Sequence, residues 1–230
     1  MLTLEEAAQR RATGVRAPAD RPSLRRSGEA GTPNVTRAMT STMQMRDVAD
    51  GDGVEPLLHF TGYASIYERG YEMWDEFGPY TEVVSAGAAT ETLNRADLSC
   101  PLVLDHDSMR RIAMTDNGSL TISEDATGLL CDAPMLDPED HDVCYIQPKM
   151  RAGLITEMSF RFRITSGIWS PDYTEFRIES FDLHRGDVSI VGYGANPYTS
   201  GTLRTPETRP SESRRPGALL IADHDVAHLR

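Results

Sequence analysis

Two short segments of the chain, about fifty residues apart, carry side chains that could together perform acyl transfer. Residues 102–107 form an apolar run that leads to His106, which stands between two aspartates. Residues 152–162 begin like the end of a helix and continue as an alternating strand pattern that contains Ser159. A serine hydroxyl becomes nucleophilic when an imidazole accepts its proton, so the pair suggests a serine nucleophile and its base.

A carboxylate that could complete such a site stands in a third segment, residues 185–197. Asp187 opens a strand-like run there, and a carboxylate can orient the imidazole and stabilise its charged form. Spacing alone leaves simpler interpretations open. A serine on a polar strand face is usually solvated, His106 could pair with a neighbouring acid, and Asp187 could form an ordinary ion pair with Arg185.

Other clusters are weaker candidates. His141 and Cys144 lie three residues apart, as metal ligands on a helix can, but two ligands do not make a site and no second pair is visible. A Cys144 nucleophile has no supporting motif, and His184 is more simply explained as a satisfied histidine at a strand edge. We therefore predict no metal ion and no cofactor.

The charge of the chain excludes one broad class of function. The formal net charge is -12, and residues 54–200 hold 24 acidic against ten basic side chains. A surface this acidic repels phosphate backbones, so direct nucleic-acid binding by the core is not expected. The three cysteines show no ligand spacing, no long apolar stretch is present, and the N-terminus lacks the pattern of a signal peptide. We expect reduced thiols, no membrane contact and a cytoplasmic location.

The middle of the chain is rich in strand patterns. Period-two alternation and β-branched residues predict strands at 57–66, 81–86, 101–105, 119–124, 128–135, 157–168, 173–183 and 187–193. A short helix is expected at 88–96. A longer one should start at Asp137, with Pro138 as its first residue, kink or split in two at Pro148 and stop at Gly153. Few helices among many strands predict an α+β protein, a small and largely antiparallel β-barrel.

Alternation within the Ser159 strand predicts its two faces. The apolar face comprises Met158, Phe160, Phe162 and Ile164. Ser159, Arg161 and Arg163 share the other face, where backbone N–H groups and guanidinium charge could stabilise an oxyanion.

Both ends of the chain differ in composition from the middle. Residues 1–53 and 201–230 mix charged, small and proline residues without sustained periodicity, apart from a short helical possibility at 2–11. Such segments bury too little to offset their ordering entropy. We predict a domain at 54–200 between two flexible tails.

The order of these segments resembles the prohead (procapsid) maturation serine proteases of tailed bacteriophages. The resemblance runs from about Leu57 to Pro197 and rests on the order and spacing of its pieces. Its pieces are Phe60-Thr-Gly-Tyr-Ala-Ser65, Val84-Ser-Ala-Gly-Ala88, Asp105-His106-Asp107, Thr127-Gly-Leu-Leu130, residues 153–162, Asp187-Val-Ser-Ile-Val191 and Ala195-Asn-Pro197. The chain departs from the family pattern at Asp187, where Glu is commoner, and at Gly194, where Pro is usual.

The resemblance implies a fold like that of herpesvirus assemblin, a small β-barrel with flanking helices. It also implies roles: His106 as general base, Ser159 as nucleophile and Asp187 as the orienting third member. Because aspartate is one methylene shorter than glutamate, a histidine of the assemblin type could replace it, and His184 is the candidate.

The implied activity is that of a serine endopeptidase of capsid maturation. Its substrates would be the scaffold protein, the N-terminal extension of the major capsid protein, or both, and it would also cleave itself. It would act inside the immature procapsid in the bacterial host cytoplasm, where it could oligomerise.

Two alternatives remain at this point. One is a catalytically silent assembly or scaffold module that keeps the protease fold, although such a homologue should have lost Ser159 or His106. The other is a different serine hydrolase, such as an esterase. The absence of Gly-x-Ser-x-Gly argues against it.

Overall fold

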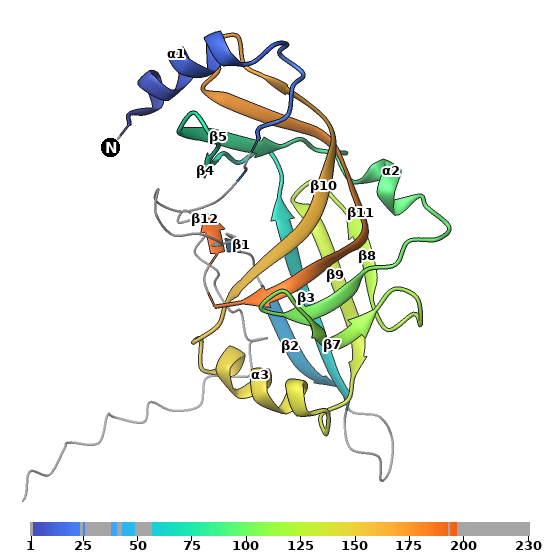
Figure 1. Ribbon diagram of the computed structural model, residues 1–230. Helices are drawn as coiled ribbons and strands as arrows, with labels where there is room; N and C mark the ends of the chain where they lie inside the picture. The colour runs from blue at the N-terminus through green and yellow to red at the C-terminus, as the bar shows by residue number, and fades with distance from the viewer. Residues whose placement is uncertain are drawn as a thin grey trace, which may run out of the picture.

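A computed structural model of the chain describes residues 2–23, 25, 38–40, 43–48, 57–192 and 194–196. This part is mostly β with a few helices, so the predicted α+β class is confirmed. Its strands form two sheets, with helix α1 (Leu4–Gly14) and helix α3 (His141–Arg151) at opposite ends of the strand-rich body (Figure 1).

The larger sheet carries the segments of chemical interest. Its described strands are β1 (Ala38–Thr40), β4 (Tyr71–Trp74), β5 (Pro79–Val84), β6 (Pro101–Leu104), β7 (Asp107–Met114), β10 (Glu157–Trp169), β11 (Glu175–Val191) and β12 (Gly194–Asn196). They run in the order β12-β1-β10-β11-β5-β4, and β6 pairs with both β11 and β7. The long strand β11 thus has β10 on one side, and β5 and then β6 on the other.

The smaller sheet is antiparallel throughout its described strands. These are β2 (Met43–Val48), β3 (Leu57–Ile66), β8 (Thr121–Glu124) and β9 (Gly128–Leu136), in the order β2-β3-β9-β8. Pairing across both sheets is largely antiparallel. The exceptions among the described pairs are β11 with β5, β11 with β6, and β1 with β12.

The predicted barrel is not confirmed. Over the described residues the two sheets follow open paths and do not close on each other. The two strands predicted at 173–183 and 187–193 are one strand, β11. Their expected boundary is an irregularity at residues 183–186, after which pairing with β10 resumes.

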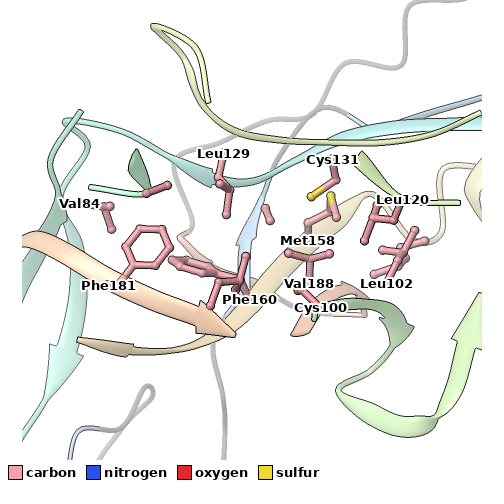
Figure 2. Close-up of a cluster of buried hydrophobic side chains, with 14 of the residues drawn as sticks. Val84, Cys100, Leu102, Leu120, Leu129, Cys131, Met158, Phe160, Phe181 and Val188 are labelled. Atoms are coloured by element: carbon pink, nitrogen blue, oxygen red, sulfur yellow. The ribbon is translucent and has the colours of Figure 1, made fainter. Parts of the chain in front are cut away.

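One hydrophobic core joins the two sheets. Figure 2 shows Met158 and Phe160 of β10 and Val188 of β11 on the side that faces Leu129 and Cys131 of β9. All five residues are buried, which confirms the predicted apolar face at the start of β10. Burial also raises the pKa of the Cys131 thiol to about 12, so this thiol is protonated and unreactive at neutral pH.

The helices differ from the prediction at their starts. Helix α3 begins three residues later than expected, because Asp140 rather than Asp137 caps it by accepting the N–H groups of Asp142 and Val143. Pro148 lies inside the helix without splitting it, since only the last turn follows. Gly153 stands just beyond the end at φ 67°, as a C-terminal glycine often does. Helix α2 (Thr90–Leu93) is shorter than the predicted 88–96.

The start of the chain does not behave as the flexible tail predicted for residues 1–53. Helix α1 has a capping box at Thr3 and Glu6 and packs on the larger sheet. The Arg11 side chain is fully buried and forms a bidentate pair with Asp75, with N–O distances of 2.8 and 2.9 Å. Composition could not predict this contact, because Arg11 is buried through an ion pair and not through apolar contacts. The predicted tail at 201–230 lies outside the described residues.

Stacking and carbonyl contacts complete the environment of Arg11. Its guanidinium donates to the carbonyls of Tyr173, Gly78 and Pro79. The guanidinium carbon also lies 4.6 Å from the centroid of the Trp169 ring. This one side chain therefore ties α1 to strand β5 and to the turn that precedes β11.

We predict that Arg11→Met strongly destabilises the protein. Removing one member of a buried pair leaves the Asp75 carboxylate uncompensated, which should lower the free energy of unfolding by about 3–5 kcal/mol. Urea unfolding followed by circular dichroism measures the change. Arg10→Met, at the exposed neighbouring position of the same helix, is the control and should change stability by less than about 0.5 kcal/mol. Equal stability of the two variants would contradict the prediction.

Candidate active site

The pairing of β10 with β11 places four polar side chains on one face of the sheet. Ser159 lies opposite Ser189, and Arg161 lies opposite Asp187. Directly opposed residues in an antiparallel pair point to the same side, and so do residues two apart on one strand. Ser159, Arg161, Asp187 and Ser189 therefore form a square, called the polar square below. The core residues Met158, Phe160 and Val188 lie on the other face (Figure 2).

Three members of the polar square are shielded from solvent. Ser159 is 1% exposed, Asp187 is 4% exposed and Ser189 is fully buried. The sequence had left open the interpretation that Ser159 is solvated, and this interpretation is wrong. The alternation was predicted correctly, but a turn from another part of the chain lies against this face.

That turn joins β6 to β7 and contains His106. Leu104 pairs with Asp107, so Asp105 and His106 are the two central residues of a hairpin turn. Both have positive φ, 51° and 56°, as a type I′ turn requires. Because β6 runs beside β11, the turn emerges next to the polar square. The Asp105 N–H donates to the carbonyl of Ile190 on β11 at 2.9 Å.

His106 contacts three of the four members of the polar square. Its Nδ1 lies 2.5 Å from Oδ1 of Asp187. Its backbone N–H donates to the Ser189 hydroxyl at 2.9 Å. Its carbonyl accepts from the Arg161 guanidinium at 3.5 Å, and another nitrogen of that guanidinium lies 3.4 Å from Oδ2 of Asp187. The fourth member of the square is Ser159.

The contact with Asp187 decides which ring nitrogen of His106 can do chemistry. Nδ1 is engaged by the carboxylate, so Nε2 is the ring atom that can accept a proton. Nε2 is buried and has no hydrogen-bond partner among the described residues. Buried polar atoms are normally satisfied, and beside a carboxylate-bound Nδ1 such an exception is a candidate position for proton transfer. The arrangement can support general-base catalysis on a hydroxyl at the polar square.

Several other candidates from the sequence lie elsewhere. Nδ1 of His184 accepts the backbone N–H of Ser99 at 3.2 Å, and the structure does not bring this histidine to His106. Arg163 pairs with Asp182 at 2.5 Å instead of facing the site. The His141 side chain is 95% exposed, and the Cys144 thiol donates to the carbonyl of Pro138. Within the described ranges, no group of three or more potential ligands could hold a metal ion.

Sequence reasoning missed the part played by Ser189. Period-two alternation along β11 puts Ser189 on the same face as Asp187, and this was the available signal. Its contact with the backbone of His106 depends on the pairing of β6 with β11, and no local pattern reveals that pairing. Arg161 was expected as an oxyanion donor, but its described contacts are to Asp187 and His106.

A close approach of backbones keeps β11 against β10 beside Asp187. The irregularity at residues 183–186 includes Arg185 at φ 60°, followed by Gly186. A Cβ atom at position 186 would lie 1.9 Å from the carbonyl oxygen of Arg161, so only glycine fits. This glycine lets pairing resume at Asp187.

A serine, an imidazole and a carboxylate held at one face of a sheet are the elements of a serine hydrolase. Comparison with known families gives the particular class. Residues 35–212 match the family described as Caudovirus prohead serine protease. The match spans well over half of the chain, so the protein belongs to this family of bacteriophage capsid-maturation proteases, as the motifs had indicated. No curated protein and no solved structure matches the chain.

Membership of the family carries general consequences. It implies a serine peptidase that acts on capsid proteins inside the procapsid. The matched range begins at residue 35, before the predicted domain start at 54, and ends at 212. None of the helices in the described part of the chain is long and apolar enough to cross a membrane.

We predict that Gly186→Ala disrupts the site. The added methyl collides with the backbone of β10, so the strands must separate beside Asp187. Overpacking of this kind costs about 1–3 kcal/mol. A displacement of about 1 Å at the reacting groups lowers peptidase activity about 100-fold. Thermal unfolding and peptide cleavage measure the two effects.

Gly192→Ala is the matched control for this change. Gly192 directly follows β11, and a Cβ atom there would meet nothing within 4 Å. This variant should keep wild-type stability and activity. If Gly186→Ala behaves in the same way, the close approach does not position the site.

Proposed function

We propose that the protein is a serine endopeptidase in which Ser159 is the nucleophile, His106 the general base and Asp187 the orienting carboxylate. One observation carries the assignment: three members of the polar square hold His106, and the fourth is Ser159. The nucleophile would then stand on the face against which the imidazole is fixed, with Nε2 left to accept its proton.

The mechanism follows from these roles. The Ser159 hydroxyl attacks the peptide carbonyl while Nε2 of His106 takes its proton, and the new C–O bond gives a tetrahedral oxyanion. His106 then passes the proton to the leaving amine, which leaves an acyl-enzyme. A water molecule, deprotonated by His106, hydrolyses the ester and restores the serine. Asp187 keeps the proton-bearing Nδ1 in place and stabilises the imidazolium in both halves of the reaction.

Ser159 is a better candidate than Ser189, the other serine of the polar square. The Ser189 hydroxyl accepts the N–H of His106 and lies 3.3 Å from the carbonyls of Val103 and Ile190. Its hydrogen-bonding capacity is directed at backbone groups. It also contacts the main chain of His106, whereas a nucleophile must approach the ring.

Asp187 is likewise a better third member than His184. Its carboxylate contacts Nδ1 of His106 at 2.5 Å, while the imidazole of His184 is engaged by the backbone of Ser99. The shorter reach of aspartate is compensated by the approach of the His106 turn to β11.

The proposed substrates are the scaffold protein, the N-terminal extension of the major capsid protein, or both. Cleavage would take place inside the immature procapsid in the bacterial host cytoplasm. Self-cleavage would trim the chain, and oligomers could form within the shell. A tail could hold the protease in the assembling shell. These substrates rest on the family, while the catalytic roles rest on the geometry of the polar square.

The alternative is a catalytically silent assembly module. Nε2 of His106 is buried and has no hydrogen-bond partner among the residues that the structure describes, and such an atom costs roughly 1–3 kcal/mol of folding free energy. A module that only assembles would gain nothing from that cost. The retained Nε2 therefore favours the active enzyme.

We predict that Ser159→Ala abolishes processing. Co-expression with the major capsid protein of the same phage, followed by intact mass spectrometry, should show defined cleavage with wild type only. A fluorophosphonate probe should label wild type at Ser159. Ser166→Ala changes another serine of β10, exposed and bound to Glu179, and should leave processing intact. Identical products from wild type and Ser159→Ala would remove Ser159 from the mechanism.

We also predict different effects at the two candidates for the third role. Asp187→Asn should lower kcat by about 10⁴-fold, because the amide holds the wrong tautomer of His106. His184→Gln should keep kcat within about twofold of wild type, since it loses only a contact with a backbone amide. Kinetics on a peptide that spans the identified cleavage site distinguish them. The opposite ranking would transfer the third role to His184.

A further inference from the structure

The general base stands in a backbone conformation that local sequence does not favour. Asp105 and His106 are two consecutive residues at positive φ, and neither is glycine. Each such residue costs free energy and persists only where surrounding contacts determine it. The turn therefore needs anchors, and these anchors decide where the imidazole points.

Strand β11 supplies hydrogen-bond acceptors for both turn residues. The carbonyl of Ile190 accepts the N–H of Asp105, and the side chain of Ser189 accepts the N–H of His106. The first is a backbone contact that any residue at 190 could make. The second requires a hydroxyl at position 189, because its acceptor is a side-chain oxygen.

The environment of Ser189 fixes its hydroxyl. The residue is fully buried between β10 and β6, where it pairs with Ser159 on one side and Val103 on the other. Its proton can be donated to the carbonyl of Val103 or of Ile190, both at 3.3 Å. These contacts fix the position of the hydroxyl oxygen beside the backbone N–H of His106.

Strand β11 thus contacts both the side chain and the main chain of His106. Asp187 holds the ring at Nδ1, and Ser189, two residues along on the same face, holds the main chain. Ser159 is opposite Ser189 in the register, so β11 sets the position of Ser159 as well as that of His106.

We propose that Ser189 is a positioning residue of the catalytic site, which acts through His106 by fixing the strained turn that carries it. The proposal rests on the assignment of His106 as the general base. Ser189 does not touch the substrate. Its loss should therefore impair proton transfer while peptide binding stays intact.

The first test is the kinetics of Ser189→Ala on a peptide that spans the cleavage site. We expect kcat to fall about 100-fold, the cost of a misplacement of about 1 Å, with KM within twofold of wild type. Ser189→Cys replaces the hydroxyl by a slightly larger thiol that is a poor acceptor, so it should show the same loss even if the alanine variant folds badly. Ser65→Ala, at a buried serine of β3 with no described hydroxyl partner, is the matched control and should keep wild-type kcat.

The second test does not require catalysis. Proton NMR of ¹⁵N-histidine-labelled protein should show a downfield signal for the Nδ1 proton shared with Asp187, assigned by its absence from His106→Gln. In Ser189→Ala and Ser189→Cys this proton should exchange with water at least tenfold faster, and in Ser65→Ala at the wild-type rate.

The two tests separate this proposal from the proposed function. If Ser159→Ala still cleaves, the nucleophile is wrong, yet the exchange rate still reports whether Ser189 positions His106. If both Ser189 variants keep the Nδ1 exchange rate and kcat within twofold of wild type, Ser189 does not position His106. A fall in kcat with unchanged exchange would also overturn the proposal, because the loss would not pass through the imidazole.

Discussion

The register between β10 and β11 is the constraint on which the rest of the site depends. It sets Ser159 against Ser189 and Arg161 against Asp187, and it sends the apolar neighbours of all four into the core. A slip of one residue would exchange the two faces, which would bury arginine and aspartate in the core and move methionine and phenylalanine to the polar face. The core therefore enforces the register, and the register assembles the polar face.

Strand β11 is central because it has partners on both sides throughout the site. Antiparallel pairing with β10 brings the serine, and parallel pairing with β6 brings the histidine turn. The carboxylate belongs to β11 itself. A single strand thus sets the relative positions of three groups that are far apart in the sequence, and strands position side chains more accurately than loops do.

Features that depend on neighbouring residues could be predicted from the sequence. Strand β3 was predicted at its exact bounds, and the faces of β10 around Ser159 were correct, because periodicity is a local signal. The start of α3 was missed because Asp137 and Asp140 can both cap a helix. The candidates His106 and Asp187 were identified from the residues and strengthened by resemblance.

Features that depend on distant pairing could not be predicted. The left-handed turn at His106, its anchor at Ser189 and the reach of Arg161 to Asp187 all require the strand order β10-β11-β6. The burial of Arg11 likewise requires Asp75, which is 64 residues away in the sequence. Composition placed that arginine in a predicted flexible tail, since nothing local marks an ionic contact as buried.

The parallel pairing of β6 with β11 also affects when the site can form. Ser189 and Val103 are far apart along the chain. Bringing such distant residues together costs loop-closure entropy before their contacts stabilise the fold. The histidine turn has no anchor until β11 is in place, and β11 is among the last described segments in chain order. A nascent or partly folded chain therefore carries the serine and the histidine without their geometry. The order of folding itself would delay proteolysis until the domain is complete.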